Sequence, residues 1–314
     1  MCLRRFFLIL TVFFFAIILS TLAFAAKKDG NSATVPVTVT VTVLGINDTP
    51  APEIPQEDVT VHMGKDLPQV IGWERAQAQR GPLQLALLID GNIRTGLIGQ
   101  QLNDIANFIE SQAPSTEVGL YYAEHGSAYA AAPFSTDHQK VAQALHLTLG
   151  LRNGESPSIY LSLSDLAKHW PTAAGTRREV VVFGSGNDPL NPGVEDPYAE
   201  ESIDGVVNAG LTVHAIPIAG TRYTFSFRGE ISADKLIQLS DETGGQTIGG
   251  ELGAPVSLAP YLDQMNRILR NQYLLTFAAK APDKKDGELR YIQVRLEEHD
   301  VKVWAPKRVL IPGR

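Results

Sequence analysis

The chain has 314 residues, of which 19% are charged, and a formal net charge of −7. A chain of this length has room for one large domain and a small one. Its acidic balance excludes the basic surface that marks nucleic-acid-binding proteins, so no nucleic-acid partner is expected.

The first 25 residues have the pattern of a secretory signal peptide. Arg4 and Arg5 precede an apolar segment, Phe6 to Leu19, and small residues follow at Ala23 and Ala25. We expect cleavage after Ala25 and a secreted, periplasmic or cell-surface protein. The only cysteine, Cys2, would leave with the leader, which excludes disulfides and thiol ligands. The alternative is an uncleaved leader that anchors the chain to a membrane, because its apolar segment nearly reaches spanning length.

Residues 26–34 are polar and read as a linker, and a small β unit is expected over residues 35–79. Val35 to Val43 alternate as VPVTVTVTV, which is the period of a half-buried strand. The turn-rich segment 47–55 follows, and residues 58–63 and 67–74 suggest two further short strands.

From Leu85 to residue 278 the predicted strands and helices alternate, which favours a doubly wound, mostly parallel α/β sheet. The alternation alone fits a Rossmann or flavodoxin-like fold equally well. We place this domain at residues 80–280, and strands in residues 281–314 complete or flank it. Residues 127–134 are expected to form an antiparallel edge strand, and Ser232 is expected to cap a helix. The expected strands are 85–90, 117–123, 127–134, 179–183, 211–218 and 273–278, and the expected helices are 97–110, 136–147, 158–169, 199–208, 232–240 and 260–271.

An apolar run ends abruptly at Asp90, which Gly91 follows. A nearly continuous apolar run is typical of a parallel strand that is covered on both faces. In open α/β sheets the ligand crevice lies outside the carboxyl ends of such strands. Asp90 therefore marks the place where this chain is expected to bind something.

The order and spacing of several segments resemble the von Willebrand factor type A domain and related proteins of bacterial secretomes, from about Val35 to the C-terminus. The segments are Asp90 to Arg94 (DGNIR), 156–160 (SPSIY), 180–188 (VVVFGSGND) and 236–245 (LIQLSDETGG). The family's metal-ion-dependent adhesion site begins with D-x-S-x-S after the first strand of the domain. Carried over, the resemblance implies site positions at Asp90, Asn92, Arg94, Ser156 and Ser185.

This sequence departs from the family's metal ligands. Magnesium in proteins is held by oxygen ligands in near-octahedral geometry. Asp90 keeps the acid, Asn92 offers an amide oxygen and Ser156 a hydroxyl, but Ser185 replaces the second acid and Arg94 brings a cation. Two like unit charges about 4 Å apart repel each other by about 4 kcal/mol at an effective dielectric of 20. We therefore expect Arg94 to pair with Asp90 and no cofactor to bind.

The alternative is a retained magnesium ion held by Asp90 and Ser156, with Asp188 or Glu155 completing the site. In the main interpretation, which has no metal, the sequence predicts a secreted, non-enzymatic interaction or adhesion module that binds a protein partner. Its binding face would consist of Asp90, Asn92, Arg94, Ser156, Ser185 and Asp188.

A secreted α/β hydrolase is the alternative from another class, but no G-x-S-x-G nucleophile motif occurs. The seven histidines show no ligand spacing, and His214 is expected to be partly packed within a strand. Tyr223, Phe225 and Phe227 alternate after the strand that ends at Ile218. They predict either a hairpin packed on the domain or a recognition loop.

Overall fold

A computed structural model describes most of the chain from residue 33 onward: residues 33–46, 51–77, 81–91, 93, 98–99, 101–147, 158–171, 176–184, 186, 197–218, 227–249 and 255–313. Residues 34–314 form one compact unit. The predicted signal peptide lies outside the described residues. No helix within the described ranges combines the length and the hydropathy needed to cross a membrane.

The centre of the α/β domain is a five-stranded sheet, in which four parallel strands are followed at one edge by an antiparallel one. This confirms the predicted mostly parallel sheet and the antiparallel edge strand. In spatial order the strands are β6 (Ser127–Ser135), β5 (Glu117–Glu124), β4 (Leu83–Asp90), β7 (Arg177–Gly184) and β8 (Thr212–Pro217).

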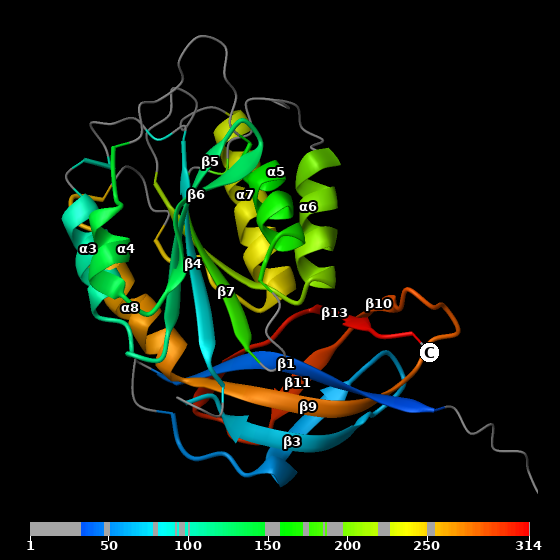
Figure 1. The fold of residues 1–314 in the computed structure, drawn as a ribbon. Coiled ribbons are helices and arrows are strands. Elements are labelled where there is room, and N and C mark those ends of the chain that lie inside the picture. The colour runs from blue at the N-terminus through cyan, green and yellow to red at the C-terminus, as the bar shows by residue number, and fades with distance from the viewer. Residues whose placement is uncertain are drawn as a thin grey trace, which may run out of the picture. The chain divides into compact units, whose positions relative to one another are not determined.

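Helices cover both faces of this sheet (Figure 1). One face packs against α3 (Leu102–Glu110), α4 (His138–Gln143) and α8 (Ala259–Arg270). The other packs against α5 (Ile159–Lys168), α6 (Pro197–Asn208) and α7 (Phe227–Thr243). The α/β domain is therefore doubly wound, as the sequence predicts.

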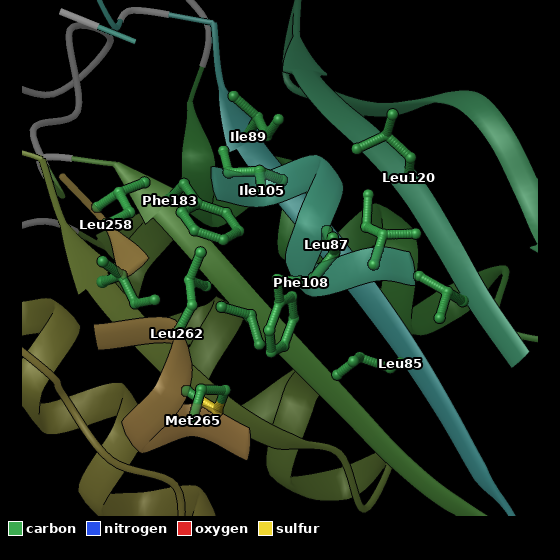
Figure 2. Packing of buried hydrophobic residues seen from close by; sticks show 14 of the residues in the cluster. Leu85, Leu87, Ile89, Ile105, Phe108, Leu120, Phe183, Leu258, Leu262 and Met265 are labelled. Atoms are coloured by element: carbon green, nitrogen blue, oxygen red, sulfur yellow. The ribbon is translucent and has the colours of Figure 1, made fainter. Parts of the chain in front are cut away.

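The central strand β4 is buried at all its positions because both of its faces are covered. Leu85, Leu87 and Ile89 face the core beneath α3 and α8, where they lie near Phe108 and Met265 (Figure 2). Ala86 and Leu88 face the opposite core. This two-sided burial explains why the run is apolar throughout rather than alternating.

A second sheet has the order β12-β1-β9-β3, and two strand pairs, β2 with β11 and β10 with β13, accompany it. These strands share a third apolar core. Their bounds are β1 Thr34–Gly45, β2 Val59–His62, β3 Gln69–Arg75, β9 Gln272–Lys280, β10 Glu288–Tyr291, β11 Gln293–Leu296, β12 Val301–Trp304 and β13 Arg308–Ile311.

The β unit is built from both ends of the chain, which differs from the unit of residues 35–79 alone that the sequence suggests. Strand β1 lies between β9 and β12, and β2 pairs with β11 (blue and orange in Figure 1). The strands of residues 281–314 therefore complete this β unit and not the central sheet. The physical reason is that the alternating pattern of β1 fixes its two faces but not its neighbours, so its pairing with β9 and β12 could not be predicted from the pattern.

Two local expectations are corrected. Helix α7 begins at Phe227, so Ser232 lies inside the helix and does not cap it. Phe227 belongs to this helix and cannot be part of a hairpin strand, while Tyr223 and Phe225 lie outside the described residues. The alternation of the aromatic residues suggested a strand, but the segment after them extends the helix.

Candidate functional site

Asp90 is the last residue of the central strand, and its side chain is completely buried. It lies opposite Ala123 of β5. The Gly91 N–H donates to the Ala123 carbonyl (3.2 Å), and the Ile93 N–H donates to the Asp90 carbonyl (3.1 Å). The first bond continues the pairing with β5 just past Asp90, so the backbone holds the carboxylate at the carboxyl edge of the sheet.

Gly184, the last residue of β7, makes room for this carboxylate. A Cβ atom at this position would lie 2.8 Å from the Asp90 Cβ and 3.0 Å from its Oδ2. Such contacts are too short for any side chain, because real Cβ atoms do not approach other atoms so closely. The strand next to Asp90 therefore ends in glycine for a steric reason.

The beginning of α5 is fixed at the same edge. The buried Ser158 caps this helix by accepting a hydrogen bond from the Leu161 N–H (3.3 Å). The Tyr160 hydroxyl donates to the carbonyl of Gly186, two residues beyond β7 (3.0 Å). The segments that begin α5 and follow β7 are thus held together at this edge.

Of the predicted site residues, only Asp90 belongs to the described part of the chain. Asn92, Arg94, Ser156, Ser185 and Asp188 lie outside it, as does Glu155. The structure does bring the neighbours of three of these segments, namely Gly91, Ser158 and Gly184, to the carboxyl side of the sheet. Convergence of the six side chains themselves stays a prediction.

The turn between β5 and β6 belongs to this edge, although sequence reasoning did not include it in the site. Glu124 and His125 are exposed, and His125 has the left-handed backbone angle φ of 51°. The Ala128 N–H donates to the Asp165 carboxylate of α5 (2.9 Å), which ties this hairpin to the helix. Gly126, shortly after the predicted strand 117–123, could have indicated this turn from the sequence.

The described residues include no cluster of the side chains that most often hold metal ions. None of them form a group of three or more His, Cys, Asp or Glu side chains that would hold a metal ion. Asp90 supplies one buried carboxylate here, whereas magnesium is held by several oxygen ligands.

A second buried polar cluster lies near the other end of β7, around Glu179. His214 of β8 lies with Nε2 2.9 Å from the Glu179 carboxylate, while its Nδ1 accepts from the Gln246 N–H (3.1 Å). The ring proton therefore lies on Nε2. Gln272 of β9 also donates to Glu179 (3.0 Å), and the Arg177 guanidinium lies 3.5 Å away.

The environment of Glu179 favours its charged form. Burial raises the pKa of this carboxyl, but the hydrogen bonds from His214 and Gln272, together with the nearby positive charge of Arg177 and the electrostatic effect of His214, outweigh burial, so its pKa is lowered. His214 was expected to be partly packed, and it is fully buried. Every member of this cluster is enclosed, so it ties the two sheets together and offers no surface for a partner.

Comparisons with known proteins find distant similarity. No family model and no curated protein matches the chain. An aerotolerance-related membrane protein from Bacteroides fragilis NCTC 9343 is 14% identical, with a TM-score of 0.43, over 60% of this chain and 98% of that one. The SpRpn10 VWA domain is 15% identical, with a TM-score of 0.38, over 58% of this chain and 94% of that one. The zinc-loaded proximal thread matrix protein 1 of the mussel byssus is 11% identical, with a TM-score of 0.45, over 64% of this chain and 48% of that one.

The topology of the chain itself carries the fold assignment. It combines a doubly wound, mostly parallel sheet, an antiparallel edge strand and a buried acid at the end of the central strand. This is the doubly wound, mostly parallel α/β fold that von Willebrand factor type A and Rossmann-like domains share, as the sequence predicted, and it is joined to a β unit. Similarities as distant as those above assign neither a partner nor a ligand to this chain.

Proposed function

We propose that this chain is a secreted, non-enzymatic module that binds a protein partner through the carboxyl edge of its central sheet. The observation that carries this proposal is the buried carboxylate of Asp90 at the end of β4, with Gly184 leaving room for it. Ligands of open α/β sheets bind outside this edge. Export would follow from the leader, and the intact mass of the exported protein checks the cleavage after Ala25.

We further propose that the adhesion site has lost its metal. In this hypothesis Arg94 supplies the positive charge beside Asp90 that a divalent ion supplies in the family. The argument is electrostatic, since a guanidinium and a divalent cation repel each other at the separations of a shared site. The competing hypothesis is a magnesium-dependent adhesion domain that uses Asp90 and Ser156, helped by Asp188 or Glu155.

Calorimetric unfolding with titrated magnesium distinguishes the two hypotheses. We expect the melting temperature of the wild type to be unaffected by magnesium. The triple variant Asn92→Ser, Arg94→Ser, Ser185→Asp regains the family's ligands and loses the competing charge. Linkage predicts about 2.7 kcal/mol of stabilisation for this variant when free metal exceeds its dissociation constant 100-fold.

The matched control is the double variant Asn92→Ser, Ser185→Asp, which keeps Arg94 and should respond less. A magnesium response of the wild type would contradict the loss of the metal. A folded triple variant without a response would show that these three positions do not converge.

The partner face is tested by reversing one exposed charge at each edge of the sheet. Glu124 lies at the end of β5, on the Asp90 edge, whereas Glu110 ends α3, which runs back from that edge. Immobilised wild type, Glu124→Arg and Glu110→Arg are exposed to the native culture medium, with and without chelator. We expect a protein retained by the wild type and Glu110→Arg, lost with Glu124→Arg, and insensitive to the chelator.

Retention that is equal for all three baits would move the binding face away from this edge. Retention that chelator abolishes would favour the magnesium-dependent alternative. Hydrolytic turnover that a single serine substitution abolishes would replace the proposal with an enzyme.

A further inference from the structure

A cavity of about 450 Å³ lies at the end of the central sheet opposite to Asp90. Arg178, near the start of β7, and Val207, near the end of α6, line it from the α/β domain. Thr38 and Thr40 of β1, Leu274 of β9 and Leu310 of β13 line it from the β unit. The β unit, which passes below this end of the sheet in Figure 1, thus closes a space that an isolated α/β domain would leave open.

Two of the three arginines at this cavity are already neutralised. Arg177 contacts Glu179 and donates to the carbonyls of Gly81 (3.0 Å) and Leu269 (3.3 Å). Arg308 donates to Glu242 (2.6 Å) and to Asp204 (2.7 Å). Burial lowers the pKa of Arg308, but these two acids more than offset it, so its pKa is raised.

Arg178 is the third, and no acid among the described residues offsets its burial. The guanidinium is half-buried, and desolvation lowers its pKa with no opposing charge. It lies beside Gly210, where the end of α6 brings the weak negative pole of the helix. A cation that is partly removed from water without a counter-charge costs free energy, and a bound anion would relieve that cost.

The alternation of β1 gives the cavity its floor. Val37 and Val39 face the core of the β unit, so Thr38 and Thr40 face the other way, toward the cavity. The Thr38 hydroxyl is paired with that of Thr276 (2.9 Å). Leu274 provides an apolar wall, and threonine residues carry both a methyl and a hydroxyl group.

We propose that this cavity binds a small amphiphilic carboxylate, with its carboxylate on Arg178 and its apolar body against Leu274, Val207 and Leu310. Small-molecule sites usually enclose about 300–1,000 Å³, combine apolar walls with a few polar anchors and fix the ligand by those anchors. The cavity has this combination: an arginine that pairs with no acid of the described residues, among largely apolar walls. The site is distinct from the partner face at Asp90 and does not depend on it.

Isothermal titration calorimetry with octanoate tests the proposal. Octanamide keeps the apolar body without the charge, and acetate and inorganic phosphate keep a charge without the body. We expect saturable 1:1 binding of octanoate, and binding at least about tenfold weaker for the other three, because both the charge-assisted contact and the apolar burial are needed. Arg178→Gln should weaken octanoate binding about tenfold or more, whereas Arg178→Lys should retain part of it. Arg270→Gln, which removes an exposed arginine from α8, is the matched control and should bind like the wild type.

Absence of saturable octanoate binding to the wild type would overturn the proposal, as would binding unchanged in Arg178→Gln. Equal binding of phosphate and octanoate would overturn the amphiphilic class. Should Arg178→Gln fail to fold, a photoreactive octanoate analogue is cross-linked to the wild type. Labelled peptides that contain residues 37–40 or 207–212 support the site, and labels found only elsewhere refute it.

Discussion

Gly184 determines how closely β7 can pass the carboxylate of Asp90. Its backbone angle φ is not positive, so the constraint is contact alone. The change Gly184→Ala would push a methyl group into Asp90, and overpacking of this kind costs about 1–3 kcal/mol. We expect a corresponding loss in the free energy of unfolding, measured by urea denaturation.

Gly205 of α6 provides the control for this prediction. The nearest atom to a Cβ added there is the Ser164 Oγ, at 4.0 Å. Gly205→Ala should stabilise the protein, by up to about 1 kcal/mol, because alanine is the better helix former. Equal effects of the two changes would mean that β7 and Asp90 are less closely packed than described.

Glu179 makes the stability of the protein depend on pH. Its pKa is lowered in the folded state, so the stability that it contributes is present above the ordinary glutamate pKa of 4.5 and is lost as the pH falls through the folded-state value. Glu179→Gln should cost about 3–5 kcal/mol at neutral pH, because it leaves Arg177 buried without its counter-charge. Urea denaturation at a series of pH values should show a shallower acid decline for this variant than for the wild type.

The exposed Glu110 serves as the comparison, and Glu110→Gln should leave both the stability and the pH profile unchanged. An acid decline that is identical in the wild type and in Glu179→Gln would show that Glu179 ionises as readily in the unfolded chain as in the folded one.

At the scale of elements, sequence periodicity predicted where most strands and helices lie but not which strands pair. The alternating valines of Val35–Val43 identify a strand, yet period two is satisfied equally by any neighbour. The pairing of β1 with β9 depends on residues more than two hundred positions apart, which local pattern cannot show. Strand β13 was not placed individually, because its sequence RVLI does not alternate apolar and polar residues.

For the candidate site too, the sequence predicted a local feature but not the contacts between distant segments. Asp90 was predicted from one abrupt end of an apolar run; the structure places it at the last position of β4 and buries its side chain, and its role as a site residue stays a prediction. The steric role of Gly184 and the bond between Tyr160 and Gly186 involve different segments, so they needed three-dimensional structure. The roles of the remaining site positions stay predictions.

A chain that begins at residue 80 tests whether the α/β domain can be separated from the strands before it, as the predicted boundary there implies. This truncation removes both β1 and β3, the neighbours of β9 on its two edges. Leu275 and Phe277 of β9, which are fully buried, would be uncovered. Unpaired apolar strands aggregate, so we expect an insoluble product or a broad, non-cooperative urea transition.

The control is a chain that begins at residue 33, which keeps every described strand and should unfold as one cooperative unit. If the shorter chain were also soluble and cooperative, the α/β domain would be an independent folding unit and β9 would not need the strands before it.

At the scale of the whole molecule, buried polar contacts join the two sheets. Gln272 of β9 donates both to Glu179 of β7 and, at 3.4 Å, to the Thr42 hydroxyl of β1. Such contacts are directional, so they hold the sheets in one arrangement where apolar packing alone would tolerate sliding. Strand β7 thus has this junction at one end and Gly184, against Asp90, at the other.

The position of β1 between β9 and β12 also has a consequence during synthesis. Thr38 and its partner Thr276 are 238 residues apart. At 5–20 residues per second, roughly 12–48 s pass between the translation of the first and of the second. Throughout that interval both edges of β1 lack their native neighbours, because β12 is translated later still. A ribosome-bound chain can therefore build the α/β layers early. Until β9 is complete, however, β1 must not pair with strands of other chains. We therefore expect a chaperone to bind β1 during synthesis.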